Sequence, residues 1–238
     1  RKKEELARVL EESLEVNRKL VRDLAEVLRK DLEIIRELVK RLVEILKKIL
    51  KVLADVIRKE ELRRALKEAE EVLRKLIRTL EEVVRRHEEI LRKLIEDLKR
   101  VVKRWEEVVD RLIKEIEDLE DVLRKLLEVV RRSVRELEKI LERLKRSVEE
   151  VIKRITEVLE ELEKLVRDLI DVLRRAGLDE ETLRKVVEDL ERLLREARRV
   201  VKEAVEKSRR SLEDLRRIIE EAIRRNEKIL RKLKEIVK

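Results

Sequence analysis

Residues 174–185 read RRAGLDEETLRK and contain the only glycine in a chain of 238 residues. Gly177 suits the left-handed position that follows the last turn of a helix, and Asp179 suits the N-cap of the next helix. Leu178 and Leu183 then occupy the N′ and N4 positions of a hydrophobic staple. The stretch therefore predicts a helix that ends just before the glycine, a reversal of the chain, and a new helix after Asp179.

The overall composition is typical of a helical protein without covalent cross-links. Proline and cysteine are absent, and charged residues make up 53% of the chain. The apolar residues are Leu, Val, Ile and Ala, together with the single aromatic residue Trp105. Without cysteine the chain forms no disulfide and offers neither a thiolate nucleophile nor a Cys-based zinc site. We therefore expect helices that are held together by packing alone.

The N-terminal segment and the hydropathy bear on location. The first residues, RKKEELARVL, include neither an initiator Met nor the apolar core of a signal peptide, which favours a mature or tag-trimmed chain. No segment approaches 18 uncharged apolar residues, so the sequence predicts no membrane-spanning helix. We expect a soluble recombinant chain, and its localisation stays unknown.

Apolar residues recur at steps of three and four along almost the whole chain, which is the period of an amphipathic helix. No window alternates with the period of two that a strand requires. Dense apolar spacing ends at Ile57, four charged residues follow, and the pattern resumes at Leu62, so the sequence predicts a turn near residues 58–61. The run that resumes there reads Leu62, Leu66, Ala69, Leu73, Leu76, Leu80 and Val83.

The segment between these two turns, residues 62–176, is about twice as long as each outer segment. As a single helix it would run about 170 Å and leave half of its apolar face uncovered, so we expect a third turn. Equal division places this turn near residue 118, where Asp118 or Asp121 suits the N-cap of a new helix.

The fold class that follows is all-α, an elongated antiparallel up-down-up-down four-helix bundle with coiled-coil-like packing. In this interpretation residues 1–238 form a single helical-bundle domain about 90 Å long. The predicted helices cover approximately residues 2–58, 61–117, 119–176 and 179–237.

The uncharged polar residues provide a check on the turns, because buried polar groups must meet at matching heights to satisfy one another. Counted along each helix from the end that holds residue 1, one set lies about 13–17 residues up and a second about 28–33 residues up. Such layers specify the register and pairing of helices. The first layer comprises Ser13, Asn17, Trp105, Ser133 and Asn226, the second comprises His87, Ser147, Ser208 and Ser211, and Thr79 and Thr156 form a third pair beside the apolar stripe.

These features resemble computationally designed helical bundles with buried hydrogen-bond networks. The likeness covers the whole chain and rests on the restricted alphabet, the staple in AGLDEETL, the turn-like VIRKEELRRAL and the layered polar residues. It implies a de novo designed scaffold with no natural biochemical activity, and designs of this kind also build heterodimers or cages from helical hairpins. Two of the three predicted turns depart from this style, because they lack glycine and proline.

His87 is the only histidine, and its place on an apolar stripe invites a role as a metal ligand, base or pH switch. A metal site requires further His or Cys ligands, and a catalytic base requires a shaped pocket, so we interpret His87 as a hydrogen-bonding core residue. Trp105 is interpreted as a network donor or core filler rather than a stacking platform. The serines lack a GxSxG motif, and a di-metal bundle needs E-x-x-H on two helices. The sequence predicts no enzyme and no catalytic, metal or cofactor site.

The first helix is rich in apolar residues between Leu32 and Ile57, where they occupy 16 of 26 positions. The simpler interpretation is deeper burial. The alternative is an exposed face for self-association or for a designed helical partner, which would make the chain a building block of a designed homo- or hetero-oligomer. That face comprises Ile35, Leu38, Val39, Leu42, Ile45, Leu46, Ile49, Leu50, Leu53 and Ile57.

The net charge of +9 admits a further interpretation, a basic coiled-coil protein that binds nucleic acid. Acidic and basic residues are interleaved throughout, as in KEIEDLEDVLRK, and this pattern favours a solvated helical surface instead. We therefore expect a rigid scaffold held by aliphatic packing and buried polar layers, with no required partner, no specific nucleic acid and no membrane.

Overall fold

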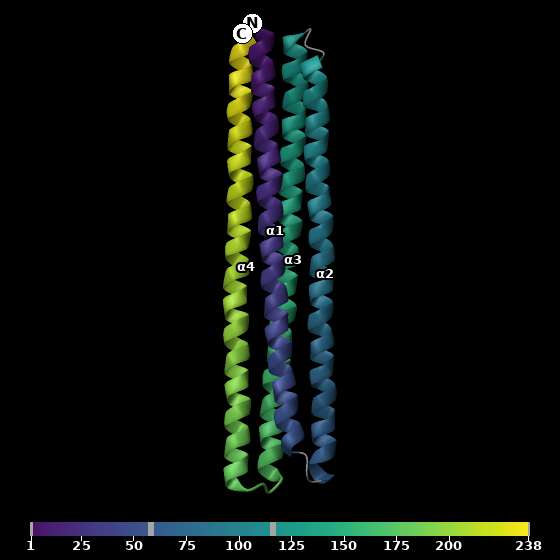
Figure 1. Cartoon of the computed structure of the whole chain (residues 1–238), viewed down its shortest axis with the longest axis vertical. Helices are drawn as coiled ribbons and strands as arrows, with labels where there is room; N and C mark the ends of the chain where they lie inside the picture. The colour runs from purple at the N-terminus through teal and green to yellow at the C-terminus, as the bar shows by residue number, and fades with distance from the viewer. Residues whose placement is uncertain (1, 57–59, 115–117, 238) are drawn as a thin grey trace. The chain divides into compact units, whose positions relative to one another are not determined.

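The computed structural model describes residues 2–56, 60–114 and 118–237, and within these ranges the chain forms four α-helices and no strand. The helices are α1 (Lys2–Val56), α2 (Glu60–Lys114), α3 (Leu119–Arg175) and α4 (Glu180–Val237). Successive helices run in opposite directions, and the start of α1 lies beside the end of α4 (Figure 1). The predicted all-α, antiparallel four-helix bundle is confirmed.

The connection between α3 and α4 forms as the glycine stretch predicts. Gly177 has a φ of 66°, in the left-handed region that glycine adopts without steric cost. The Leu183 N–H donates to the Asp179 carbonyl at 2.9 Å, which closes the first turn of α4. Leu178 and Leu183 are half-buried and pack against the same apolar core, as the staple requires.

The predicted turn near residue 118 lies between the end of α2 at Lys114 and the start of α3 at Leu119. The two candidate caps are now distinguished, because the Glu120 N–H donates to Asp118 Oδ1 at 3.1 Å. Asp118 is therefore the N-cap, and Asp121 lies inside the first turn of α3. Residues 115–117, at the predicted end of the second helix, lie outside the described residues.

The predicted turn near residues 58–61 is bracketed in the same way. Helix α1 ends at Val56 and α2 begins at Glu60. Residues 57–59, which include the predicted end of the first helix at residue 58, lie outside the described residues. The change of direction between α1 and α2 agrees with a turn at this place in the chain (Figure 1).

The chain divides into two compact units, and each contains a segment of all four helices. The first unit comprises residues 1–31, 89–147 and 209–238, and the second comprises residues 32–88 and 148–208. Each unit has its own apolar core. The expectation of a single domain stays a prediction.

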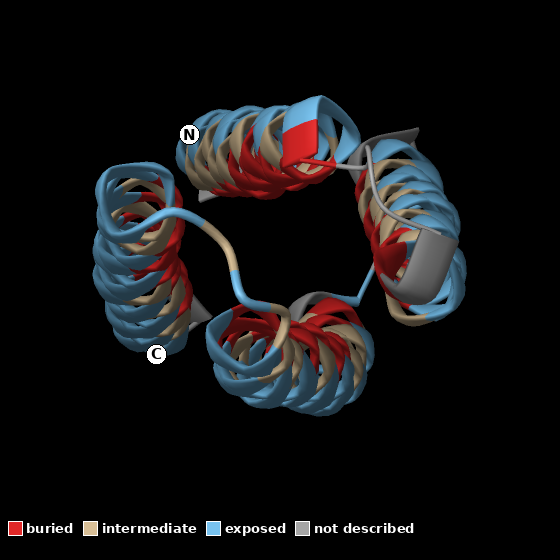
Figure 2. Cartoon of the chain, turned by 90° about the horizontal axis from the view of Figure 1, so that it is seen from below, coloured by how far each residue is buried: buried red, intermediate tan, exposed pale blue. Residues whose placement is uncertain are grey.

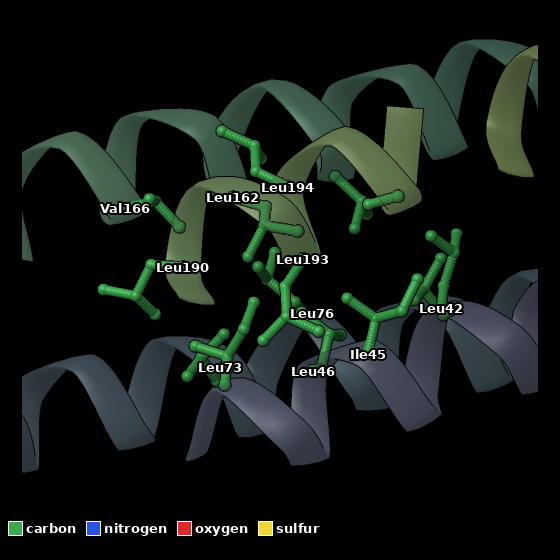
Figure 3. Packing of buried hydrophobic residues seen from close by; sticks show 14 of the residues in the cluster. Leu42, Ile45, Leu46, Leu73, Leu76, Leu162, Val166, Leu190, Leu193 and Leu194 are labelled. Atoms are coloured by element: carbon green, nitrogen blue, oxygen red, sulfur yellow. The ribbon is translucent and has the colours of Figure 1, made fainter. Parts of the chain in front are cut away.

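Every helix turns an apolar stripe towards the other three helices and its charged face to solvent, as the burial colours show (Figure 2). In the second unit, Leu46, Leu76, Leu162 and Leu193 come from the four different helices and are all buried in one core (Figure 3). Full burial of a leucine side chain contributes about 1.5–3 kcal/mol. The repeated three- and four-residue apolar steps of the sequence therefore supply the main stabilising contribution to the unit.

The core of the first unit follows the same plan. Leu10 of α1, Val109 of α2, Leu126 of α3 and Leu233 of α4 are buried together. Trp105 adds the largest side chain of this core and is 2% exposed. Its indole ring is therefore part of the packed interior, as the sequence suggested.

Charged side chains pair across neighbouring helices on the outside of both units. Such exposed pairs contribute at most about 1 kcal/mol each, so they assist the order of the helices without determining it. In the first unit the pairs join α1 to α2 (Arg18–Glu106), α2 to α3 (Arg104–Glu136) and α4 to α1 (Lys232–Glu12). In the second unit they join α1 to α2 (Arg36–Glu88), α1 to α4 (Arg41–Glu203) and α3 to α4 (Glu163–Arg198).

Candidate functional site

Four side chains form a buried polar cluster in the first unit, which we call the Ser13 cluster: Ser13 and Asn17 of α1, Trp105 of α2 and Asn226 of α4. The Trp105 indole Nε1–H donates to Ser13 Oγ at 3.1 Å. Asn226 Nδ2 donates to Asn17 Oδ1 at 3.2 Å, and Asn17 Nδ2 donates to the Ser13 carbonyl oxygen at 2.9 Å. The cluster therefore links three helices through side chains that the sequence placed at one height.

The donors of the cluster are better satisfied than its acceptors. All four residues are at most 5% exposed, so unmet polar groups there are costly. Among the described residues, Asn226 Oδ1 is buried and accepts no hydrogen bond. A single carbonyl oxygen without a donor costs about 1–3 kcal/mol, which reduces what the cluster contributes to stability.

Ser133 was predicted to complete this layer from α3, and the structure corrects that expectation. The side chain is half-buried, and the hydrogen bonds of the Ser13 cluster do not include it. The apolar stripe of α3 runs from Val130 to Leu137, which are both buried. Its centre line crosses the helix between Ser133 and Val134, which are both half-buried. Ser133 therefore lies at the edge of the stripe rather than on it.

The residues of the second predicted layer are each buried on their own helix. His87 is 1% exposed, Ser147 7%, Ser208 0% and Ser211 8%. His87 continues the stripe of α2 between Val83 and Leu91, and it has an interaction partner in the structure. The interpretation of His87 as a core residue agrees with this burial. Ser208 differs, because its Oγ makes no hydrogen bond with the described residues.

One buried polar residue, Asp31, was not predicted from the sequence; it lies on α1, is 1% exposed and has an interaction partner. Its signal was present in the sequence. Leu24, Leu28, Asp31 and Ile35 follow the helical steps of the apolar stripe, so a charged residue occupies a core position. The heights of the uncharged polar residues and His87 give no indication of Asp31, because aspartate is usually exposed on a helix so rich in charged residues.

Thr79 and Thr156, the third predicted pair, do not join helices. Each hydroxyl donates to the carbonyl oxygen four residues earlier in its own helix, at 2.9 Å to Lys75 and 2.8 Å to Ile152. This local bond is common for threonine in helices, and it satisfies the hydroxyl without a second helix.

The apolar face of α1 that was considered for a partner is largely internal. Leu50 is half-buried, and Ile57 lies outside the described residues. Between Ile35 and Leu53 the structure agrees with deeper burial, the simpler of the two interpretations. The buried members are Ile35, Leu38, Val39, Leu42, Ile45, Leu46, Ile49 and Leu53.

Each unit has a surface groove along a seam between helices. In the second unit, Val39 and Val43 of α1 and Val84 of α2 form an apolar floor, with charged residues such as Lys40 and Glu81 beside it. Both grooves carry charges of both signs, and neither gathers the convergent polar groups that are typical of a ligand site. The groove of the first unit, between α1 and α4, is lined by Glu12, Glu15, Val16, Lys19, Arg225, Lys228, Ile229 and Lys232.

Among the described residues, two surface groups have shifted pKa values, and each shift has a local cause. A side-chain hydrogen bond to Glu106, reinforced by its charge, raises the pKa of the Arg18 guanidinium. A hydrogen bond from Lys125 lowers the pKa of the Asp121 carboxyl, and Arg124 adds to this effect. Both groups belong to exposed ion pairs and lie outside the Ser13 cluster.

The described residues include no group of three or more His, Cys, Asp or Glu side chains placed to hold a metal ion. None of the four helices, over the ranges that the structure describes, is long and apolar enough to cross a membrane. Comparison of the chain with protein-family models, with curated proteins and with solved structures found no match. Within the described residues, the Ser13 cluster joins buried polar side chains of α1, α2 and α4 by hydrogen bonds, and it is the candidate functional site.

Proposed function

We propose that this chain is a structural scaffold of the de novo designed kind that its sequence resembles, a helical bundle that carries out no catalysis. The observation that supports this proposal is the engagement of the Ser13 cluster. Trp105, Asn17 and Asn226 each direct their donors to a group of the bundle itself. Polar groups used in this way stabilise one arrangement of helices and are not presented to a substrate.

The physical role of the cluster is to specify the pairing of helices. Aliphatic stripes pack nearly as well after a helix slides by one turn, about 5.4 Å along its axis. The Trp105–Ser13 and Asn226–Asn17 bonds, at 3.1 and 3.2 Å, would break in any such register. Each break would leave a buried donor unmet, at a cost of about 1–3 kcal/mol. The cluster thus favours the native register over its neighbours.

An all-apolar cluster tests this role. The variant Ser13→Ala, Asn17→Leu, Trp105→Leu, Asn226→Leu keeps the stripes and removes every donor and acceptor side chain of the cluster. We expect it to stay helical and to unfold at the same or a higher denaturant concentration, but to give several oligomeric or conformational species. Size-exclusion chromatography with light scattering and the number of backbone NMR signals measure this heterogeneity.

A matched control uses polar residues that bond only within their own helix. Thr79→Val with Thr156→Val also replaces hydroxyls by apolar groups, and we expect a single species with the signals of the parent chain. If the all-apolar variant behaves as uniformly as this control, the cluster does not specify pairing and the proposed role is wrong.

The two other interpretations lack a supporting observation. Docking through the apolar face of α1 requires side chains such as Leu42 and Ile49, which are 3% and 0% exposed. For nucleic acid, we expect no salt-dependent binding of labelled DNA or RNA at low ionic strength. Anisotropy measurements that reveal a steep dependence on salt would contradict the scaffold proposal.

A further inference from the structure

The groove along the α1–α2 seam of the second unit has an apolar floor. Val39, Val43 and Val84 form this floor, and the groove has a volume of about 550 Å³. Val43 and Val84 are half-buried and pack against the core of the unit. We call this surface the α1–α2 groove. A volume of this size admits apolar side chains of a partner.

The two margins of the α1–α2 groove carry basic side chains at one level. The Arg36–Glu88 ion pair joins α1 to α2 and relates the levels of these antiparallel helices. Lys40 lies four residues beyond Arg36, and Arg85 lies three residues before Glu88. Because a helix rises about 1.5 Å per residue, both lie about 4.5–6 Å from the ion pair on the same side of it. Lys40 and Arg85 line the groove and are exposed.

Acidic side chains occupy the next level of the same margins. Glu44 and Glu81 lie four residues further along the groove than Lys40 and Arg85, a step of about 6 Å. Both glutamates line the groove and are exposed. Across the seam, therefore, a base is opposite a base and an acid is opposite an acid, and like charges repel. None of the four side chains forms an ion pair with a residue that the structure describes.

We propose that two copies of this chain associate through the α1–α2 groove as an antiparallel, two-fold symmetric dimer. The symmetry axis crosses the groove midway between its basic level and its acidic level. Lys40 then faces Glu44 of the second copy, and Arg85 faces Glu81 of the second copy. Four ion pairs form, because a two-fold interface repeats every contact. The groove is complementary to itself, so a second copy is the partner that its charges specify.

The apolar floor lies at the centre of this interface. Val43 and Val84 are each one residue, about 1.5 Å, from the level of the axis, so each meets its own counterpart. The contact leaves the buried side chains of α1, such as Leu42 and Ile49, in the core. One groove provides a small interface, and small interfaces are typical of weak complexes. We therefore expect a dissociation constant above the micromolar range.

The charge pattern distinguishes this arrangement from a parallel one. A two-fold axis along the groove would place α1 against α2 of the second copy at equal levels. Lys40 would then face Arg85, and Glu44 would face Glu81. Both contacts join like charges, which oppose association at an interface. The margins of the α1–α2 groove therefore favour antiparallel copies.

Sedimentation equilibrium of the full chain, from micromolar to near-millimolar concentration, provides the first test. At low salt we expect the average mass to rise from 28.9 kDa towards twice that value as the concentration increases. Added salt should shift the equilibrium towards the monomer, because it screens exposed ion pairs. The monomer mass at every concentration would overturn the proposal. So would a dimer that salt leaves unchanged, since that behaviour indicates a different surface.

Charge reversal at one level of the groove provides the second test. Glu44→Lys with Glu81→Lys makes both levels basic, whereas Lys40→Glu with Arg85→Glu makes both levels acidic. Each variant alone should raise the dissociation constant about tenfold or more, because the ion pairs become like-charge contacts. An equimolar mixture of the two should form a heterodimer with at least the affinity of the parent chain. Association of either variant alone at the parent affinity, or a mixture that stays monomeric, would contradict the proposed interface.

A matched control makes the same change of charge on the other two helices of the unit. Glu157→Lys of α3 with Glu188→Lys of α4 replaces two exposed glutamates that do not line the groove. At physiological ionic strength this variant should keep a dissociation constant within about twofold of the parent value, because distant exposed charges are screened. An equal loss of association in the control and in Glu44→Lys with Glu81→Lys would show that net charge, and not the groove, governs association.

A spin label on Asp55→Cys measures the relative direction of the two copies, since the chain contains no other cysteine. Position 55 is exposed and lies 13 residues beyond the level of the axis, which α1 crosses at residue 42. In the antiparallel dimer the two labels are therefore 26 residues apart in level, about 39 Å along the bundle. Parallel copies would hold the labels at one level, about 10–15 Å apart. The short distance in the dimer would refute the proposed arrangement.

Discussion

Replacement of Ser13 by alanine tests the hydrogen bond that joins α1 to α2 inside the Ser13 cluster. The substitution removes the Oγ acceptor but leaves the Trp105 Nε1–H in the core, where the side chain is 2% exposed. A buried donor that loses its partner costs about 1–3 kcal/mol. Removal of the buried hydroxyl also relieves its own desolvation cost, which offsets part of this loss. We therefore expect Ser13→Ala to lower the free energy of unfolding by about 1–2 kcal/mol.

Ser208→Ala is the matched control, since it makes the same chemical change at another buried serine. Ser208 is 0% exposed, and its Oγ makes no hydrogen bond with the described residues. Removal of a buried hydroxyl without a partner relieves its desolvation cost. We therefore expect Ser208→Ala to be neutral or to raise the free energy of unfolding by up to about 1 kcal/mol.

Equilibrium unfolding in guanidinium chloride, followed by far-UV circular dichroism and by Trp105 fluorescence, measures both free energies. An unchanged dependence on denaturant shows that the two variants expose the same surface as the parent chain. A double-mutant cycle of Ser13→Ala with Trp105→Leu should give a coupling energy of about 1 kcal/mol. If both serine variants lose the same stability, or if Ser13→Ala loses none, the hydrogen bond does not stabilise the cluster as argued.

Three further predictions concern the turn, the surface and the core. Gly177→Ala should lower the free energy of unfolding by about 1 kcal/mol in denaturant titrations. The loss comes from the φ of 66° alone, because a Cβ at this position meets nothing within 4 Å. An unchanged free energy of unfolding would show that the turn tolerates a side chain. In an NMR titration the pKa of the Asp121 carboxyl should lie below its ordinary value and rise in Lys125→Ala, because Lys125 donates the hydrogen bond that lowers it. Because the pKa of Asp121 is lower in the folded chain, the Asp121–Lys125 pair stabilises the fold above the unfolded pKa and loses its effect as the pH falls through the folded pKa. An unchanged pKa of Asp121 in Lys125→Ala would exclude Lys125 as the cause. Leu66→Ala, at a core position that is 0% exposed, should lower the free energy of unfolding by about 2–5 kcal/mol in chemical unfolding. Val72→Ala, at a position that is 36% exposed, should change it by less than about 0.5 kcal/mol. Similar losses of stability in the two variants would contradict the assigned core.

The number and direction of the helices followed from apolar periodicity, from Gly177 and from the lengths of the segments. These signals are local, because the left-handed backbone of glycine and the capping of aspartate depend on a few neighbouring residues. The same lengths placed Ser13, Asn17, Trp105 and Asn226 at one height, where the structure joins them by hydrogen bonds. Rise per residue is nearly constant in a helix, so height along the bundle can be counted from the sequence.

The rotation of each helix about its axis depended on the tertiary structure. Ser133 lies at the edge of its stripe while Asp31 lies within the core, although both fit helical spacing when read from the sequence. Apolar steps of three and four do not distinguish two neighbouring positions at the margin of the stripe, because both fit the helical period. Packing against the side chains of the adjacent helices decides which of the two is buried. The choice of Asp118 over Asp121 as the N-cap depended likewise on where the backbone of α3 begins. Sequence alone therefore determined the helices and the heights of their polar groups, whereas only packing between helices decided which of those groups face one another.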